Sequence, residues 1–175
     1  MAAELVFLIG YRGTGKSLLA GLLATRLNWQ ALDADSLLEE RVGRSVKQIF
    51  ADEGEAGFRD REAALLAELC TKQCHVIATG GGIILREENR ARLKAAGLCL
   101  WLQANPATIW QRLQADPRSD ELRPNLAGGG LTEIEQLLQV RTPWYRECAD
   151  LEVNTVDRTP AAIVDEMVAF LRTRI

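Results

Sequence analysis

Gly10-Tyr11-Arg12-Gly13-Thr14-Gly15-Lys16-Ser17 fits the pattern G-x-x-x-x-G-K-[ST] of a phosphate-binding loop. The apolar run 5–9 precedes it and is typical of a strand, and the segment 16–27 follows it with the apolar spacing of a helix. In this context glycines let the backbone wrap around phosphate oxygens, and the helix start adds its positive dipole. The sequence therefore predicts a nucleotide-binding P-loop.

The residues of this loop have distinct expected roles. The backbone around Gly10, Gly13, Thr14 and Gly15 would hold the phosphates of ATP. Lys16 would reach the β- and γ-phosphates and act in catalysis. The hydroxyl of Ser17 would bind the Mg²⁺ ion that bridges those phosphates, so Mg²⁺ is the expected cofactor.

Beyond the loop, short apolar runs alternate with longer segments of helical periodicity, which predicts an α/β fold with a parallel sheet. We expect strands at residues 5–9, 30–32, 76–78, 98–102 and 151–153. We expect helices at residues 16–27, 36–41, 46–53, 58–70, 89–96, 108–114, 132–145 and 160–172. The first helix should bury one face made of Leu18, Leu19, Leu22, Leu23 and Leu27. Pro143 should kink or end its helix.

The chain length of 175 residues fits a single domain, residues 1–175. Within it we expect a helical substrate-binding insert at about residues 33–61. We also expect a lid at about residues 115–130, where Pro117, Pro124 and three successive glycines interrupt any regular pattern.

Composition excludes several classes of function. The formal charge of −3 provides no basic field for nucleic acid or an anionic membrane. The N-terminus lacks a basic region before its short apolar run, so we expect a cytoplasmic protein with no membrane partner. We also expect a monomer. The four cysteines and the single His75 lack zinc-type spacing, so we expect reduced, mostly buried thiols and a strand-start histidine.

Two carboxylates, Asp33 and Asp35, stand at the end of an expected strand. Residues two apart on an extended segment face the same side, and ligands of open α/β sheets collect at this edge. One carboxylate could orient the Mg²⁺ water shell while the other accepts a proton from an attacking hydroxyl. The competing interpretation is a helix cap, in which Asp35 opens a helix at Ser36.

Other candidate residues carry weaker signals when each is taken alone. Arg59 and Glu62 lie three apart on one expected helix, so they form either a fixed site pair or a solvated ion pair. The glycines of residues 80–82 either expose amides to a ligand or form a tight turn. Arg123 and Arg141 are ordinary surface arginines unless other residues tie them to a site.

A P-loop by itself does not distinguish a kinase from a GTPase switch or a motor ATPase. The base-reading pattern N-K-x-D of GTPases is absent, no D-x-x-G motif follows, and the chain is short for a motor with coupling elements. A small-molecule or nucleotide kinase is therefore the class that the sequence favours.

Taken together, the motifs closely resemble the shikimate kinase family. The resemblance runs from Leu5 to the last helix and rests on Gly10 to Ser17, Asp33-x-Asp35, Phe58-Arg59-x-x-Glu62, Thr79-Gly80-Gly81-Gly82, Arg123-Pro124 and Arg141-x-Pro143-x-Tyr145-Arg146. It implies a P-loop kinase fold whose five-stranded parallel sheet, in the order 2-3-1-4-5, is flanked by helices. It also implies transfer of the γ-phosphoryl group of ATP to the 3-hydroxyl of shikimate.

The same resemblance implies roles for individual residues on the acceptor side. Asp35 would meet the reacting hydroxyl, and Asp33 would support the Mg²⁺ shell. Arg59 and Arg141 would hold the substrate carboxylate, in a pocket also lined by Gly80, Gly81 and Gly82.

On the nucleotide side, the resemblance implies that Arg123 closes with the lid onto the phosphates and that Pro160 lies near adenine. Arg112 is a candidate for stacking on adenine but stays outside this set. Asn125 and Trp144 stand where the family usually has leucine, which leaves lid dynamics open at Asn125 and concerns packing at Trp144.

Two other functions remain as alternatives. A related small P-loop kinase acting on gluconate or a nucleoside monophosphate would share the loop and the lid but need different acceptor-side residues. A nucleotide-dependent binding switch would hold ATP without an acceptor and change shape between states. The acceptor-side arginines and the missing switch motifs weigh against the second.

Overall fold

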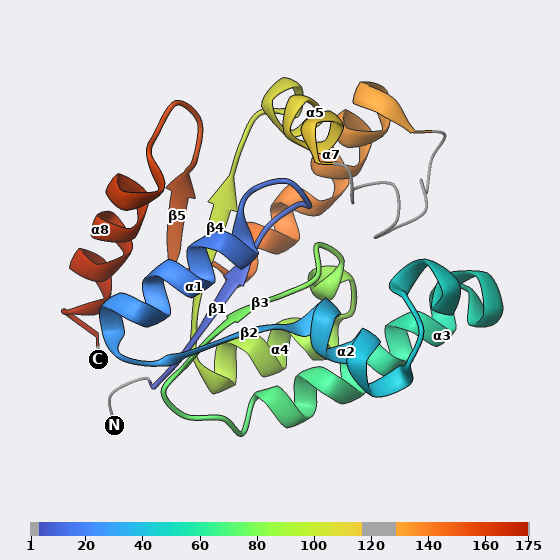
Figure 1. Cartoon of the computed structure of the whole chain (residues 1–175), viewed down its shortest axis with the longest axis horizontal. Coiled ribbons are helices and arrows are strands. Elements are labelled where there is room, and N and C mark those ends of the chain that lie inside the picture. The colour runs from blue at the N-terminus through green and yellow to red at the C-terminus, as the bar shows by residue number, and fades with distance from the viewer. Residues whose placement is uncertain (1–3, 117–128, 175) are drawn as a thin grey trace.

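The computed structural model of the chain describes residues 4–116 and 129–174. Within these ranges five strands pair in parallel in the order β2-β3-β1-β4-β5 (Figure 1). The strands are β1 (Leu5–Ile9), β2 (Gln30–Asp33), β3 (His75–Ala78), β4 (Leu98–Gln103) and β5 (Leu151–Asn154). The predicted α/β fold and the predicted strand order are confirmed.

Helices connect the strands in the way that parallel pairing requires, because a parallel neighbour can be reached only by a crossover. They are α1 (Lys16–Leu27), α2 (Ala34–Val42), α3 (Val46–Leu69), α4 (Glu87–Ala96), α5 (Pro106–Ala115), α7 (Gly130–Cys148) and α8 (Pro160–Leu171). A short 3₁₀ turn, η1 (Ile83–Leu85), follows β3. Most expected helices and strands agree with these bounds to within two residues.

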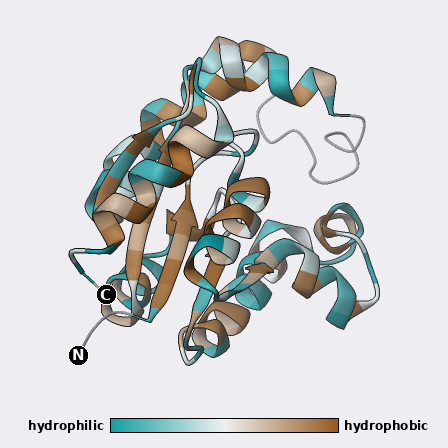
Figure 2. Cartoon of the chain, turned by 60° about the vertical axis from the view of Figure 1, so that its left-hand side comes forward, coloured by the Kyte–Doolittle hydropathy of each residue, from teal (hydrophilic) through white to brown (hydrophobic). Residues whose placement is uncertain are grey.

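The sheet separates two apolar layers, and alternation along β1 assigns its side chains to them. Val6 and Leu8 pack with α1 and α8 on one face, whereas Phe7 and Ile9 pack with α3, α4 and α7 on the other. Figure 2 shows the resulting arrangement, with hydrophobic strands between helices whose outer sides are hydrophilic. Strands buried on both faces explain why their sequences are continuous apolar runs.

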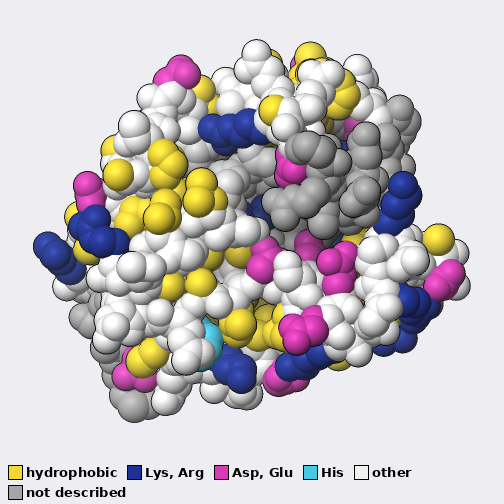
Figure 3. All heavy atoms as spheres, in the orientation of Figure 1, with side chains coloured by type: hydrophobic (Ala, Val, Ile, Leu, Met, Phe, Trp, Pro, Cys, Tyr) yellow, Lys and Arg dark blue, Asp and Glu magenta, His cyan; other side chains and the backbone are white. Residues whose placement is uncertain are grey.

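The prediction for the buried face of α1 is partly wrong. Leu19 and Leu23 are buried together with Ala20 and Ala24, but Leu18 is 59% exposed and Leu22 is 39% exposed. The small alanines lie toward the sheet because they let the helix approach it closely. Figure 3 shows hydrophobic side chains on the surface over α1 and α8.

Three local predictions about helices are also corrected. Residues 46–53 and 58–70 were expected as separate helices, yet α3 runs through both and leaves helical geometry only at Gly54 (φ 71°, ψ 179°). The helix α2 begins at Ala34 rather than Ser36. Pro143 does not end its helix, because α7 continues past it to Cys148. A proline removes one backbone donor, and the remaining hydrogen bonds and the packing of Tyr145 hold the helix; the alternative of a kink at Pro143 stays a prediction.

The remaining sequence expectations concern the cysteines, the lid and membrane segments. All four cysteines are free thiols, and Cys99 and Cys148 are buried. Ala115 ends α5 and Gly130 begins α7, so most of the expected lid, including Arg123, Pro124 and Asn125, lies outside the described residues. Among residues 4–116 and 129–174, we find no helix with the length and hydropathy needed to span a membrane.

Candidate active site

The loop between β1 and α1 forms a tight phosphate cradle. Gly10, Gly13 and Gly15 have φ angles of 141°, 78° and 94°, a region that side chains disfavour. A Cβ atom at Gly10 would also lie only 2.5 Å from the carbonyl oxygen of Leu102 on β4. The absence of a side chain at Gly10 therefore lets the loop lie directly against β4. Residues 13–17 line the cavity above the loop.

Inside the loop, polar side chains hold the backbone in a closed turn. The hydroxyl of Thr14 donates to the carbonyl of Tyr11 at 2.7 Å. The ammonium group of Lys16 donates to the carbonyls of Gly10 at 2.8 Å and Tyr11 at 2.7 Å. Both side chains are buried, so the positive charge of Lys16 is already held within the cradle. Because Gly15 caps α1 without a side chain, the first amides of that helix can serve a phosphate.

The carboxylate of Asp33 connects the P-loop to the start of α2. It accepts a hydrogen bond from the hydroxyl of Ser17 and another, at 3.0 Å, from the amide of Ser36. Asp33, and not Asp35, is therefore the N-cap of α2, which corrects the capping interpretation. Asp35 lies in the first turn of that helix rather than on an extended segment, yet both acids line the same cavity.

One cavity of about 630 Å³ joins these groups, a size typical of small-molecule sites. It extends from the P-loop to Asp33 and Asp35 on one side and to Arg112 and Pro160 on the other. Of the predicted site residues, its lining includes Gly13, Thr14, Gly15, Lys16, Ser17, Asp33, Asp35, Gly81 and Pro160. It does not include Gly10, Arg59, Gly80, Gly82 or Arg141.

Arg59 lies in a buried setting next to this cavity. Its side chain is 5% exposed, and its guanidinium group donates to Glu62 at 2.8 Å and to Glu55 at 3.4 Å. A Cβ atom at Gly82 would stand 2.4 Å from the guanidinium nitrogens. The absence of a side chain at Gly82 thus makes room for Arg59, an observation that supports the predicted grouping of these two residues.

Arg141 occupies a similar buried position on α7. It is 6% exposed, and its guanidinium carbon lies 5.8 Å from the centre of the Tyr11 ring in the P-loop. Burial raises the pKa of Tyr11, and the neighbouring Arg12 and Arg141 oppose that rise. The tyrosine is therefore a neutral surface against which Arg141 packs.

The glycine turn after β3 links the P-loop to α7. Tyr145, one turn beyond Arg141, donates its hydroxyl to the carbonyl of Gly81. A Cβ atom at Gly81 would lie 3.3 Å from the amide nitrogen of Arg12 and 3.4 Å from the carbonyl oxygen of Gly10. Gly81 therefore faces the P-loop, whereas Gly82 faces Arg59. These two adjacent residues thus lie between the P-loop and the buried arginine.

Two buried donor atoms of these arginines lack an acceptor. The Nε atoms of Arg59 and Arg141 have no hydrogen-bond partner within the part of the chain that the structure describes. Leaving such a donor unsatisfied costs about 1–3 kcal/mol. An anionic ligand would supply such an acceptor.

Arg112 makes contacts that the sequence did not predict. Its guanidinium group donates to the carbonyl of Gly13 at 3.3 Å, to the hydroxyl of Thr155 at 3.0 Å and to the carbonyl of Thr155 at 2.9 Å. It thereby joins α5, the P-loop and the segment after β5 at the cavity wall. No local pattern marks an arginine in the last turn of a helix as special, because its partners lie more than forty residues away.

Comparison with known proteins decides the family. The family model described as shikimate kinase matches residues 12–172 of this chain. This chain belongs to the shikimate kinase family. A shikimate kinase from Rhodopirellula baltica is 43% identical over 93% of this chain and 88% of its own length. One from Pseudomonas syringae pv. syringae is 41% identical over 95% of both chains.

Solved structures of the family have the same fold. A shikimate kinase from Acinetobacter baumannii in complex with shikimate aligns with a TM-score of 0.91 at 31% identity, covering 98% of this chain and 94% of its own. A gluconokinase from Sinorhizobium meliloti aligns with a TM-score of 0.60 at 15% identity, covering 98% of this chain and 93% of its own. The second match reflects the common kinase fold alone, so it does not favour the gluconate alternative.

Proposed function

We propose that this chain transfers the γ-phosphoryl group of ATP to the 3-hydroxyl of shikimate, giving ADP and shikimate 3-phosphate. Membership of the shikimate kinase family supports the reaction. The observation that carries the proposal is the single cavity in which the P-loop faces Asp35, because donor and acceptor must meet there.

On the nucleotide side, the amides of the P-loop and of the first turn of α1 hold the phosphates. Lys16, now bound to loop carbonyls, turns its ammonium group to the β- and γ-phosphates and stabilises the charge that develops during transfer. Pro160 and Arg112 line the opposite end of the cavity, where the base of ATP fits.

On the acceptor side, Arg59 and Arg141 bind the carboxylate of shikimate through charge-assisted hydrogen bonds. This contact supplies an acceptor to their buried Nε atoms and fixes which ring hydroxyl faces Asp35. Asp35 then accepts the proton of that hydroxyl as the oxygen attacks the γ-phosphorus. Gly80, Gly81 and Gly82 would line the pocket of the carboxylate, which the positions of Gly81 beside the P-loop and Gly82 beside Arg59 support.

Ser17 and Asp33 fit the expected Mg²⁺ ion. Their oxygen atoms already lie in contact at the mouth of the cradle, and oxygen ligands are those that Mg²⁺ prefers. Mg²⁺ often keeps several waters and binds through one or two protein oxygens together with substrate phosphates. Such an ion neutralises phosphate charge when bound. Ser17 would hold it directly and Asp33 would orient its water ligands.

Four further expectations remain part of the proposal. Arg123 would contribute a positive charge to the transferring phosphate, and residues of about 115–130 would close as a lid. The helices of about residues 33–61 would act as the substrate-binding insert of a single domain. We also propose that the protein acts as a cytoplasmic monomer.

A coupled assay of ADP release tests the function. Purified protein with Mg-ATP should release ADP only when shikimate is added, and EDTA should abolish the activity. Gluconate and nucleoside monophosphates serve as matched acceptors and should give no more than the background rate. Absence of shikimate-dependent release at saturating substrates would contradict the proposal, and ATP binding without turnover of any acceptor would favour the binding switch.

A further inference from the structure

The helix α3 is made of two helical parts that meet at a kink at Gly54. The backbone there has φ 71° and ψ 179°, whereas residues on either side are helical. Arg59 lies in the second part, five residues beyond this kink. Phe50 of the first part stacks on Phe58 of the second at 4.5 Å between ring centres. The guanidinium carbon of Arg59 lies 5.9 Å from the Phe50 ring centre and 5.2 Å from that of Phe58.

The direction of Arg59 therefore depends on the angle between the two parts of α3. A rotation at the kink would move Phe50 away from Phe58 and change the aromatic surface under the guanidinium group. Glycine at the kink costs conformational entropy and does not by itself fix an angle. Contacts that cross the kink must therefore hold the two parts in register, and the stack of Phe50 on Phe58 is one of them.

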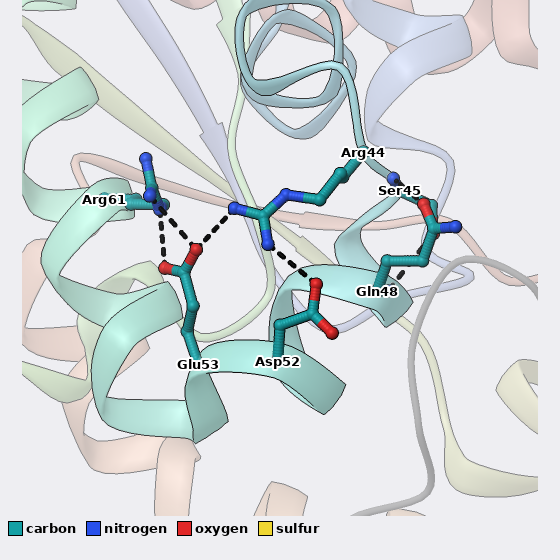
Figure 4. Close-up of polar contacts among 6 residues, drawn as sticks. All are labelled: Arg44, Ser45, Gln48, Asp52, Glu53 and Arg61. Atoms are coloured by element: carbon teal, nitrogen blue, oxygen red, sulfur yellow. Dashed lines mark hydrogen bonds and ion pairs between the residues drawn. The ribbon is translucent and has the colours of Figure 1, made fainter.

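Glu53, the last residue before the kink, makes such a contact. Figure 4 shows its carboxylate between Arg44, from the loop before α3, and Arg61, from the second part of the helix. It accepts from Arg61 at 2.7 Å and 3.0 Å and from Arg44 at 2.5 Å. Arg44 also donates to Asp52 at 2.7 Å. We name these four residues, Arg44, Asp52, Glu53 and Arg61, the kink network.

Gly57 provides a second and independent observation. A Cβ atom at this position would lie 2.7 Å from the Cβ of Glu53 and 3.4 Å from one of its carboxylate oxygens. The root of the Glu53 side chain cannot move aside as the tip of a long chain could. The missing side chain at Gly57 is thus what lets Glu53 pack directly on the second part of the helix.

We propose that Glu53 is a positioning residue for shikimate binding, which acts through the kink network to hold Arg59 in its direction. The proposal rests on the proposed role of Arg59 in binding the shikimate carboxylate. Exposed single ion pairs contribute little, but a two-pronged contact within a network of several charges is the favourable case. Hydrogen bonds from Arg61 and Arg44 lower the pKa of Glu53 to about 2, so the network stays charged at any ordinary assay pH.

Steady-state kinetics of Glu53→Gln tests the proposal. The amide keeps the size of the side chain but removes the charge that both arginines share. We expect the KM for shikimate to rise roughly threefold to tenfold, as for the loss of a coupled charge network. The KM for ATP and kcat should stay within about twofold of the wild type, because the P-loop and Asp35 are not part of the network.

Glu68→Gln is the matched control. Glu68 lies on the same helix and forms an equally short two-pronged pair with Arg41, at 2.6 Å and 2.7 Å, but this pair does not cross the kink. Glu68→Gln should leave the KM for shikimate and the KM for ATP unchanged. Equal effects of the two substitutions, or no effect of either, would overturn the proposal. A fall in kcat together with a rise in both KM values would overturn it too, because that is the result of a general loss of structure.

Gly57→Ala supplies a second route if Glu53→Gln folds poorly. Alanine favours a helix more than glycine does, so a stability loss from propensity is not expected. Its Cβ would clash with the Cβ of Glu53, so the two parts of the helix must shift relative to each other. The same shikimate-specific rise in KM should follow. Gly21→Ala in α1, where an added Cβ meets nothing within 4 Å, controls for the substitution itself. An unchanged KM for shikimate in Gly57→Ala would count against the proposal.

Arg59→Ala, measured in parallel, separates this inference from the function on which it rests. If Arg59→Ala leaves the KM for shikimate unchanged, the assigned role of Arg59 is wrong. If Arg59→Ala raises that KM and Glu53→Gln does not, Arg59 binds the substrate without help from Glu53, and only the positioning role is wrong.

Discussion

Arg59 and Arg141 are buried, and neither lines the cavity above the P-loop. Each packs on an aromatic ring and keeps one Nε atom without an acceptor among the described residues. Stacking holds a planar guanidinium group in one orientation, so less freedom is lost when a planar carboxylate binds.

Replacing either arginine with alanine should therefore weaken shikimate binding alone. Loss of a charged hydrogen bond costs on the order of 1.5–3 kcal/mol, so the KM for shikimate should rise about tenfold to a hundredfold. The KM for ATP should hardly change. Lysine should restore only part of the loss because it lacks the two-donor fork.

A shikimate analogue whose carboxylate is reduced to an alcohol tests the same contact from the substrate side. The wild type should bind this analogue poorly, whereas the alanine variants should bind the analogue and shikimate about equally. If reduction of the carboxylate weakens binding equally in the wild type and the variants, these arginines do not bind the carboxylate.

Asp35 should behave differently because its role is in the chemical step. Asp35→Asn keeps a polar contact to the hydroxyl but cannot accept its proton, so kcat should fall about a hundredfold or more. The dissociation constant for shikimate, measured by calorimetry, should change much less. A variant with normal kcat and a raised KM would make Asp35 a binding residue only.

Two of the three glycines after β3, Gly81 and Gly82, give a paired test of the site. A methyl group at Gly82 would meet the guanidinium of Arg59, so Gly82→Ala should raise the KM for shikimate about tenfold by overpacking. A methyl group at Gly81 would meet the backbone of Gly10 and Arg12, so Gly81→Ala should raise the KM for ATP instead. Steady-state kinetics with each substrate varied in turn measures both. The same pattern in both variants would contradict the division of the site between these neighbours.

At the scale of secondary-structure elements, the start of α2 combines a structural and a chemical task in one carboxylate. Asp33 caps the helix through the amide of Ser36 and contacts Ser17 of the P-loop. The cap therefore places Asp35, in the first turn of the helix, by the same carboxylate that we propose orients the water ligands of Mg²⁺.

Two substitutions at Asp33 should separate these tasks. Asparagine caps a helix about as well as aspartate, so Asp33→Asn should keep the melting temperature while raising the Mg²⁺ concentration needed for half-maximal activity. Asp33→Ala should lose the cap as well, at a cost of about 1 kcal/mol in the free energy of unfolding. Thermal melts and Mg²⁺ titrations of kcat measure the two effects. A normal Mg²⁺ response in both variants would exclude Asp33 from the metal shell.

At the scale of the whole molecule, contacts between segments far apart in the chain form the end of the cavity that Arg112 and Pro160 line. Arg112 is the clearest case, since one side chain joins the P-loop to the segment after β5. Thr155 adds to this junction by donating its hydroxyl to the carbonyl of Gln103 on β4.

Arg112→Ala should affect both stability and nucleotide binding. Loss of its hydrogen bonds should lower the melting temperature by roughly 3–6 °C for a chain of this size. It should raise the KM for ATP and leave the KM for shikimate unchanged. Arg41→Ala, which removes an exposed ion pair remote from the cavity, is the control and should change neither KM. If both variants lose stability alone, Arg112 is a structural bridge without a role in ATP binding.

The sequence by itself determined the features that depend on near neighbours in the chain. The P-loop, the strand before it and the bounds of α1 follow from a contiguous motif and from apolar periodicity. The strand order and the roles of Asp33, Asp35, Arg59 and Arg141 came instead from joint resemblance to a family, because no local signal encodes which strands pair. The resemblance placed Arg59 beside the glycine turn, but the contact with Gly82 is visible only in three dimensions.

Tertiary structure alone decided the outcome where the local sequence allowed more than one, such as which leucines of a helix are buried and where a helix ends. Leu18 and Leu19 have the same propensity, yet only Leu19 is buried, because the position of the sheet selects one side of the helix. The turn signals at residues 54–57 do not end α3, because aromatic stacking and the Glu53 contacts hold the two parts together across Gly54. Arg112 resembles any surface arginine until folding brings Gly13 and Thr155 to it. Hydrogen bonds and packing between distant residues set these outcomes, and such contacts leave no periodic mark on the sequence.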